Sequence, residues 1–439
     1  MLKIGCQMRF LYLRVISSFI YRWFNVPQTA PEINRLNFRN VQIDAIGVGL
    51  ASTGAPFLPV LLTRLGANTL EVSMLTFMPA LTGALLAIPL GHFLETRKNI
   101  VPWFSFARLA VLMSYGFTGL LVLFLSEASA ILGILGLWAV ATVPQTILSI
   151  CFSVVMNQIA GSRGRFELMS HRWSILGFTN AATALMAGQF LDRVAFPLNY
   201  QIFFITLSIG GIISYYFSSK IVLADNPPQI KKVRTSLKEQ AICYVQLIYH
   251  EKPFVSFIWK RFIFLSGAAL AAPLLPIYYV REINASDYWI ALIQIAANTT
   301  VILGYFFWTN QSRRKGSRAV LLATTLGSSL YPILVGVSQQ VWPVVIFAGL
   351  NGIFTAGLNL VFFDELMRRV PADHNATFVA AAQTLQYLSM IAAPLLAPIL
   401  SKWLGFGPAL MLAGGISIVG FILFVLESPR PISEEAVSV

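Results

Sequence analysis

The sequence predicts an all-α polytopic membrane protein whose twelve transmembrane helices form two pseudo-symmetric six-helix bundles. Three observations lead to this fold class: the composition, the length of the apolar runs and an internal repeat. Hydrophobic residues make up 56% of the 439 residues, and charged residues only 11%. Soluble proteins carry roughly 25% charged residues. A soluble core therefore does not explain this composition.

The apolar runs have the length of membrane-spanning helices. A run of about 20 apolar residues crosses the hydrocarbon as a helix. Backbone amides in lipid need internal partners, and long runs without alternation exclude a β-barrel. We expect helices at residues 41–64, 69–92, 100–124, 130–158, 171–192, 198–219, 253–280, 287–308, 318–337, 341–363, 376–400 and 404–426.

A ten-residue phrase occurs twice in the chain. Residues 55–64 read APFLPVLLTR, and residues 272–281 read APLLPIYYVR. Each copy closes one apolar run, the first and the seventh, which predicts two parallel halves of the kind typical of transporters. The two prolines of each copy each remove a helix hydrogen bond, so we expect bends toward the outer ends of these two helices.

The basic residues divide unevenly between the two sides of the expected membrane. The chain has 31 Lys and Arg residues and a net charge of +13. With an internal N-terminus, the outer side holds only Arg64, Arg193, Arg281 and Lys402, while Arg108 lies within a span. This asymmetry predicts an integral, multi-pass plasma (inner) membrane protein with both termini cytoplasmic. The positive charge therefore indicates topology and attraction to anionic lipid, and no nucleic-acid partner.

The spans and the hydrophilic segments give the expected domains. They are a cytoplasmic N-terminal segment at 1–40, a six-helix bundle at 41–219, a basic cytoplasmic linker at 220–252, a second six-helix bundle at 253–427 and a cytoplasmic tail at 428–439. Residues 1–25 begin like a signal peptide, but Arg9, Arg14 and Arg22 interrupt the apolar run. An interfacial amphipathic helix fits this segment better, with a disordered extension and a partner-binding helix as alternatives.

The loop after the second span carries a recognisable pattern. It reads GHFLETRKN, in which the glycine, the acid and the basic residues are Gly91, Glu95, Arg97 and Lys98. With twelve spans, two halves and a basic central linker, the chain resembles the major facilitator superfamily over nearly its whole length. The acid is usually Asp in that family, and the glycine expected before the last basic pair is absent here. In the second half, Trp308 stands where the acid would be expected.

The resemblance implies a gating role for this loop. A carboxylate suits a helix N-terminus and a cation suits a C-terminus, so a short loop can hold charges against a neighbouring helix. Breaking such a contact would couple the loop to conformational change, which makes Glu95 a coupling candidate. The alternative is an ordinary positive-inside turn.

Polar residues recur at helical spacing inside two of the spans. In the resembling family the first, fourth, seventh and tenth helices line the central cavity. Here the fourth and tenth spans carry polar residues every four positions, on one helical face. The expected cavity residues, which include single amides of other spans, are Gln145, Ser149, Asn157, Asn180, Gln294, Asn298, Asn351, Thr355, Asn359, Gln383 and Gln386. For any single amide, a hydrogen bond that joins two helices is the alternative.

Ionisable residues within the spans are few, and each is informative. Asp44, near the start of the first span, is a coupling candidate, with a proton relay, a structural ion pair and direct substrate contact all open. We expect Arg108 and the pair Lys260 and Arg261 to extend to the cytoplasmic interface. A cytoplasmic charge cluster is expected at the end of the tenth span, at Asp364, Glu365, Arg368 and Arg369.

These features favour a secondary active transporter that moves a small neutral, amphipathic or zwitterionic organic solute by alternating access. Proton coupling is left open. The alternative is a transporter-shaped accessory subunit or receptor without transport activity. An enzyme is not expected, because His92, His171, His250 and His374 have no companions for a metal or catalytic site. ATP is not expected as the energy source, because no nucleotide-binding loop is found in the sequence. The expected partners are a small-molecule solute and membrane lipid, with no cofactor, for a monomeric protein.

Overall fold

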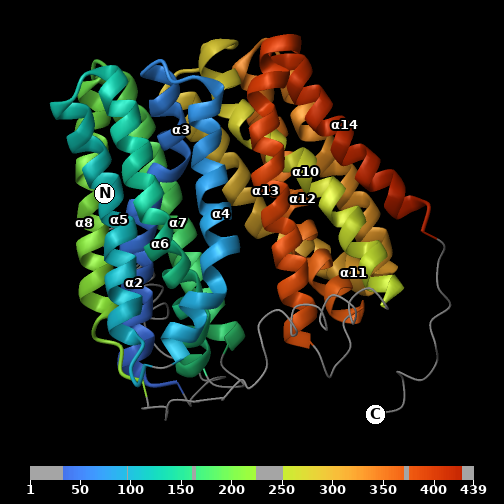
Figure 1. The fold of residues 1–439 in the computed structure, drawn as a ribbon, viewed down its shortest axis with the longest axis horizontal. Helices are drawn as coiled ribbons and strands as arrows, with labels where there is room; N and C mark the ends of the chain where they lie inside the picture. The colour runs from blue at the N-terminus through green and yellow to red at the C-terminus, as the bar shows by residue number, and fades with distance from the viewer. Residues whose placement is uncertain (1–32, 96, 161–164, 224–250, 370–374, 428–439) are drawn as a thin grey trace, which may run out of the picture. The chain divides into compact units, whose positions relative to one another are not determined.

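The computed structural model describes residues 33–95, 97–160, 165–223, 251–369 and 375–427, and every regular element in these ranges is a helix (Figure 1). The all-α polytopic fold predicted from the sequence is therefore confirmed. The expected amphipathic helix in residues 1–25 and most of the basic linker lie outside the described residues.

The helices occur where the apolar runs predict them. The first half contains α2 (Arg35–Ser52), α3 (Gly54–Arg64), α4 (Thr69–Glu95), α5 (Val101–Phe124), α6 (Glu127–Ala160), α7 (Arg165–Arg193) and α8 (Leu198–Ser218). The second half contains α10 (Lys252–Arg281), α11 (Asp287–Val337), α12 (Val341–Arg369), α13 (Asn375–Leu404) and α14 (Phe406–Val425). The first span is α2 followed by α3, and α11 comprises the eighth and ninth spans, which meet at Gly316.

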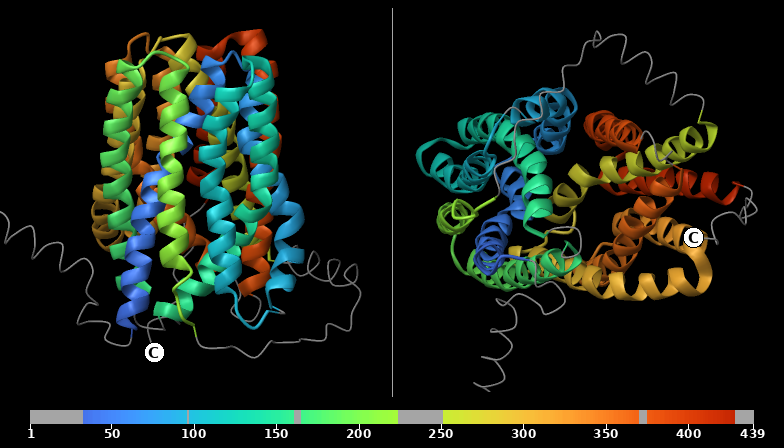
Figure 2. Two further views of the ribbon diagram at one scale, coloured as in Figure 1. Left: turned by 90° about the vertical axis from the view of Figure 1, so that its left-hand side faces the viewer. Right: turned by 90° about the horizontal axis from the view of Figure 1, so that it is seen from below.

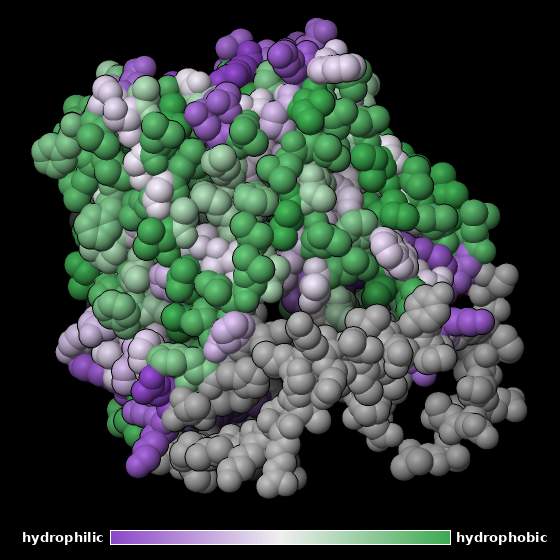
Figure 3. Space-filling view, viewed as in Figure 1, coloured by the Kyte–Doolittle hydropathy of each residue, from purple (hydrophilic) through white to green (hydrophobic). Residues whose placement is uncertain are grey.

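Most of these helices are apolar enough to cross a membrane. Ten membrane-crossing candidates are found in the described residues, with α2 and α3 taken as one and α11 as one. The helix α7 is not among them; its charged residues lie near its ends, and the stretch between them includes polar residues such as Asn180 and Gln189. Apolar side chains cover much of the face seen in Figure 3, and large ones such as Phe106 and Phe306 are exposed. Such a surface suits lipid rather than water.

The chain divides into two compact units. The first comprises Met1–Arg234 with Asn284–Asn298, and the second comprises Thr235–Ile283 with Thr299–Val439. The beginning of α11 therefore packs with the first unit, although it follows α10 in the sequence. Within the first unit, α2, α5 and α8 lie side by side (Figure 2).

Glycines allow close helix contacts in both units. A Cβ atom on Gly210 of α8 would lie 2.5 Å from the carbonyl oxygen of Gly47 in α2. In the second unit, a Cβ on Gly267 of α10 would lie 2.4 Å from the carbonyl oxygen of Ala413 in α14. Small residues let helix backbones approach closely, which is how helices gain packing energy in lipid. The corresponding helix pairs of the two units thus both pack closely through glycines.

The two copies of the repeated phrase differ in their helix geometry. In the first copy the helix divides at Thr53, whereas α10 runs without interruption through the second copy. The residues just before the first copy are Ser-Thr-Gly, and the corresponding residues before the second are Ala-Leu-Ala. The Thr53 hydroxyl donates to the carbonyl oxygen of Gly49 at 2.9 Å. Ser, Thr and Gly have lower helix propensities than Ala and Leu, so the helix of the first span is less stable at this place. The proline of the first copy destabilises it further.

Candidate functional site

A buried carboxylate lies at the centre of the most unusual site in the first unit. Asp44 in α2 has no exposed side-chain surface. Its Oδ2 atom accepts a hydrogen bond from Arg108 of α5, and the Arg172 guanidinium of α7 lies 3.5 Å from the same oxygen. Its Oδ1 atom accepts a hydrogen bond from the Ser214 hydroxyl of α8 at 2.6 Å. One carboxylate therefore connects four helices, and we call these four residues the Asp44 cluster.

Aromatic rings surround the two guanidinium groups. The Arg108 guanidinium carbon is 4.4 Å from the centre of the Phe104 ring, and that of Arg172 is 4.8 Å from the centre of the Phe152 ring. The side chains of Arg108 and Arg172 are only 4% and 3% exposed. The prediction that Arg108 extends to the interface was wrong, because a carboxylate and ring faces supply local partners that replace water.

The cluster holds more cationic and polar groups than it pairs. Two guanidinium groups share one carboxylate among the described residues, so these side chains carry a net positive charge. The Nε atoms of Arg108 and Arg172 have no hydrogen-bond partner among the residues that the structure describes. Buried charges of this kind are costly, and within membrane helices they commonly mark substrate or ion pathways.

Sequence reasoning missed Arg172 and Ser214. Arg172 is the second residue of the predicted fifth span. A basic residue at the start of an apolar span could have identified it as a candidate site residue. Ser214 gives no signal, because serine is common in membrane helices and 170 residues separate it from Asp44.

The predicted gating residues are only partly described. Gly91 lies in α4, where a Cβ atom would meet no described atom within 4 Å. The Arg97 guanidinium carbon lies 4.2 Å from the centre of the Phe93 ring, and Lys98 is exposed. The side chain of Glu95, the last residue of α4, lies outside the described residues. The gating role of this loop stays a prediction.

The polar stripe of α6 is exposed along its length. Gln145, Ser149, Ser153 and Asn157 are all exposed. The hydroxyls of Ser149 and Ser153 donate to carbonyl oxygens of their own helix. For Gln145 and Asn157, the structure gives no side-chain partner among the described residues. Within the stripe, the amides of Gln145 and Asn157 are therefore the groups that can form further hydrogen bonds.

Other candidate residues join helices within their own unit. Asn180 of α7 donates to the Ser52 hydroxyl at 3.2 Å, and Asn359 of α12 donates to the Tyr305 hydroxyl at 3.3 Å. Asn351 accepts a hydrogen bond from Ser328 at 3.1 Å. These bonds agree with the role of interhelical amides in membrane bundles.

The remaining candidates have varied surroundings. The Thr355 hydroxyl donates to the Asn351 carbonyl oxygen at 2.8 Å, within its own helix. Gln386 accepts a hydrogen bond from Arg261 at 2.8 Å. Gln294 is half-buried, and the exposed residues are Asn298 and Gln383.

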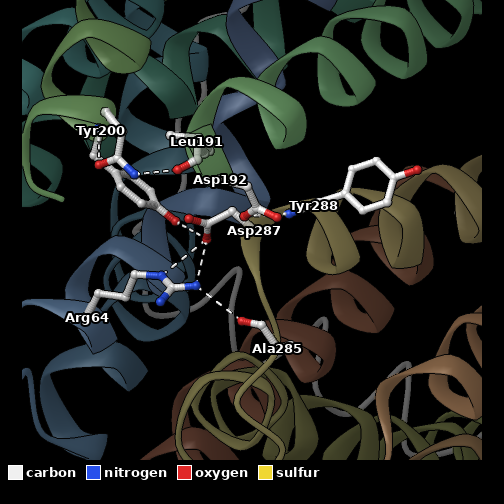
Figure 4. A network of polar contacts seen from close by, with 8 residues as sticks. Arg64, Leu191, Asp192, Tyr200, Ala285, Asp287 and Tyr288 are labelled. Carbon is white, nitrogen blue, oxygen red and sulfur yellow. Dashed lines mark hydrogen bonds and ion pairs between the residues drawn. The ribbon is translucent and has the colours of Figure 1, made fainter. Parts of the chain in front are cut away.

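A second polar network surrounds the start of α11 (Figure 4). Asp287 accepts hydrogen bonds from Arg64 at 2.9 Å and from the Tyr200 hydroxyl at 2.6 Å, both at Oδ1. Arg64 also donates to the Ala285 carbonyl oxygen, and Asp192 accepts from the Tyr288 backbone. All of these residues belong to the first unit. The arginine that ends the first copy of the repeat therefore fixes the beginning of α11.

In the second unit, a charge network surrounds Glu427, which follows α14. Glu427 accepts from Lys260 at 3.0 Å and from Arg369 at 3.4 Å, while Arg369 also pairs with Glu365 at 3.0 Å. The predicted cluster at the end of the tenth span is confirmed as a set of ion pairs. Lys260 and Arg261 are half-buried and pair with Glu427 and Gln386, and their extension to the interface stays a prediction.

Part of the chain is similar to a known family and to named relatives. Residues 261–438 match the family model of the major facilitator superfamily. "Multidrug resistance protein MdtG" of Proteus mirabilis (strain HI4320) is 27% identical over 188 residues, which is 39% of this chain and 45% of the relative. The protein of the same name from Salmonella arizonae (strain ATCC BAA-731 / CDC346-86 / RSK2980) is 25% identical over 196 residues, 40% of this chain and 48% of the relative. The match thus spans less than half the length of these curated relatives.

Solved transporter structures share the fold along almost the whole chain. The nucleoside transporter NupG has a TM-score of 0.64 at 11% identity, covering 89% of this chain and 98% of NupG. The xylose transporter XylE from E. coli, in an inward open conformation, has a TM-score of 0.62 at 12% identity, covering 91% and 96%. The chain therefore shares the fold of these multi-pass transporters, and residues 261–438 are similar to the major facilitator superfamily.

Proposed function

We propose that this protein is a secondary active transporter that moves a small organic solute across the membrane by alternating access. The exposed polar stripe of α6 is the observation that carries the proposal. Its amide groups at Gln145 and Asn157 have no partner among the described residues, although α6 is an apolar helix. Polar side chains avoid hydrocarbon, so such a face belongs against water or a solute.

The side chains of the stripe indicate the class of solute. Amides and hydroxyls recognise neutral or zwitterionic groups through hydrogen bonds and supply no fixed charge. We therefore propose a small neutral, amphipathic or zwitterionic solute. The similarity to proteins named for multidrug resistance supports an organic compound of this type. The proposed contacts are Gln145, Ser149, Asn157, Asn180, Gln294, Asn298, Asn351, Thr355, Asn359, Gln383 and Gln386.

Flux into reconstituted vesicles tests this proposal. A thermal-shift screen first selects stabilising solutes, because a ligand stabilises the folded state by mass action. Gln145→Ala should then lower the uptake of a selected solute about tenfold, as expected when one hydrogen bond of roughly 1.4 kcal/mol is lost. Gln158→Ala is the matched control, since Gln158 is an exposed amide of α6 outside the stripe. Equal uptake by both variants would remove the stripe from the solute path.

The alternative is a receptor or accessory subunit that binds without transport. It predicts a solute that stabilises the protein, binds with the same affinity in vesicles and produces no flux under any gradient. Transport driven by a pH difference would instead extend the proposal to proton coupling. In that case Asp44→Asn, checked for folding, should abolish the pH dependence if Asp44 carries the proton and keep it if Asp44 is a structural ion pair.

The loop after α4 is proposed as a gate. Glu95, with Gly91, Arg97 and Lys98, would form contacts that break as access alternates. If Glu95→Gln leaves both the transport rate and the conformational preference unchanged, the loop is an ordinary connection. We further propose an inner-membrane monomer with both termini cytoplasmic, in line with the distribution of basic residues.

A further inference from the structure

A cavity lies where the start of α2 meets the end of α8 in the first unit. Its volume is about 350 Å³, within the range of small-ligand pockets. Its lining residues are Asn34, Leu36, Asn37, Arg39, Asn40, Phe217, Lys220 and Val222. It is separate from the Asp44 cluster and from every residue proposed to contact the solute.

Two asparagines preform this cavity. The Asn37 side chain donates to the Val222 carbonyl oxygen at 2.7 Å and accepts from the Val222 N–H at 3.0 Å. The Asn40 amide donates to the Lys220 carbonyl oxygen at 3.2 Å. These bonds hold the chain that leaves α8 against the first turns of α2. The walls are therefore fixed before any ligand binds, which lowers the entropic cost of binding.

The cavity is electropositive. Arg39 and Lys220 both contribute to its lining and are exposed, and none of the lining residues is acidic. The Lys220 ammonium lies 3.7 Å from the centre of the Tyr216 ring, which positions it at the end of α8. The N-terminus of α2 adds a partial positive charge. An arginine, a lysine and neighbouring amide groups form a suitable set of donors for a phosphate.

The surroundings of the cavity are apolar. Leu36 and Val222 in its lining are 70% and 75% exposed. On α8, Ile209, Ile212 and Tyr216 are 58%, 57% and 53% exposed, so an apolar face with an aromatic ring continues from the cavity along the helix. A soluble phosphate would gain nothing from this face. A phospholipid would place its phosphate on the cations and its acyl chains along α8.

We propose that this cavity is a binding site for the headgroup of an anionic phospholipid. At the corresponding ends of α10 and α14 in the second unit, two of the basic residues already have partners within the protein. There, Glu427 pairs with Lys260, and the carbonyl oxygens of Val425 and Glu427 accept from Arg318. The proposed site belongs to the first unit.

Lipid titration of the purified full chain in detergent micelles tests the proposal. Native mass spectrometry gives the apparent affinity for phosphatidylglycerol, with phosphatidylcholine as the neutral reference. The double variant Arg39→Gln, Lys220→Gln should bind phosphatidylglycerol about tenfold more weakly, because two charge-assisted contacts are lost. The charge-conserving variant Arg39→Lys, Lys220→Arg should retain most of the affinity. Both positions are exposed, so folding without lipid should be unchanged.

Arg35→Gln is the matched control, since Arg35 is an exposed basic residue of α2 outside the cavity lining. An equal loss of affinity in this variant would mean general attraction to anionic lipid and would overturn the site. Equal affinities for phosphatidylglycerol and phosphatidylcholine would do the same. Stabilisation by inorganic phosphate to the level reached with phosphatidylglycerol would indicate a soluble ligand instead.

Discussion

The two units treat their charged residues in opposite ways. In the first unit, the side chains of Asp44, Arg108 and Arg172 are 0%, 4% and 3% exposed. In the second unit, Lys260 is 16% exposed, Arg369 18% and Glu427 24%. Asp44 and Arg261 occupy equivalent positions in the repeat. Asp44 lies as many residues before the first copy of the repeated phrase as Arg261 lies before the second copy. An acid in one half thus corresponds to a base in the other.

Burial, rather than the number of ion pairs, therefore governs how much a charge contributes to stability. A buried charge that loses its partner costs several kcal/mol, whereas exposed pairs contribute about 0–1 kcal/mol. The second unit distributes its charges over a partly exposed network. The first unit concentrates one carboxylate against two guanidiniums in an apolar interior. The Asp44 cluster should therefore be far more sensitive to substitution than the network around Glu427.

Substitution of Asp44 gives the largest expected effect. Asp44→Asn leaves two buried guanidinium groups without a carboxylate, so the free energy of unfolding should fall by about 3–5 kcal/mol. Denaturant titration in detergent micelles measures this change. The triple variant Asp44→Leu, Arg108→Met, Arg172→Met removes all three charges and should recover part of the loss. If Asp44→Asn lowers the free energy of unfolding by less than about 1 kcal/mol, the Asp44 cluster contributes no more to stability than an exposed ion pair does.

The glycine contacts should respond alike in the two units. Gly210→Ala and Gly267→Ala each force a methyl group to within 3 Å of a backbone oxygen on the neighbouring helix. Overpacking of this kind costs about 1–3 kcal/mol, and the same unfolding titration should give similar values for both. Gly415→Ala is the control, because a Cβ there would meet nothing within 4 Å. Very different costs at Gly210 and Gly267 would mean that the units differ in packing as well as in charge.

Substitution of Glu427 should cost less than that of Asp44. Glu427→Gln weakens the pairing of two partly exposed cations, for which we expect a loss of about 1 kcal/mol. Raising the salt concentration should reduce this difference, since exposed charges are screened, while the cost of Asp44→Asn should barely change. Thermal unfolding at low and high salt checks both statements. A salt-independent cost at Glu427 would contradict the contrast between the units.

The smallest effect is expected at an exposed pair of α12. Arg368 pairs with Asp364 one helical turn away at 3.1 Å, and its side chain is 64% exposed. Arg368→Gln should change the free energy of unfolding by about 0.3–0.5 kcal/mol at most. Arg369→Gln, which removes a more buried partner of both Glu365 and Glu427, is the comparison and should cost more. The reverse order would show that exposure does not govern these pairs.

Much of the fold could be predicted from local sequence. Apolar runs predicted every helix, because each run of the chain must satisfy its own backbone in lipid. The division of α11 at Gly316 fell between two predicted spans, where the positive φ of 80° suits glycine. A charge cluster at the end of α12 was also predicted, and the structure joins its residues in ion pairs four positions apart.

The candidate site was predicted less completely. Asp44 was recognised as important because a carboxylate in an apolar run is costly in isolation. Its partners could not be identified, since 64 and 170 residues separate it from Arg108 and Ser214. The expected exposure of Arg108 was wrong for the same reason.

Local sequence was enough to predict the all-α polytopic fold and the places of the helices, and it predicts two related halves. These follow from hydrophobicity and local hydrogen bonding, which each segment carries in its own residues. The packing of the helices brings Asp44 against two arginines, Arg64 against the start of α11, and Arg39 and Lys220 into one cavity. Such contacts join distant segments, and their energies depend on burial and distance, which arise only when the helices pack.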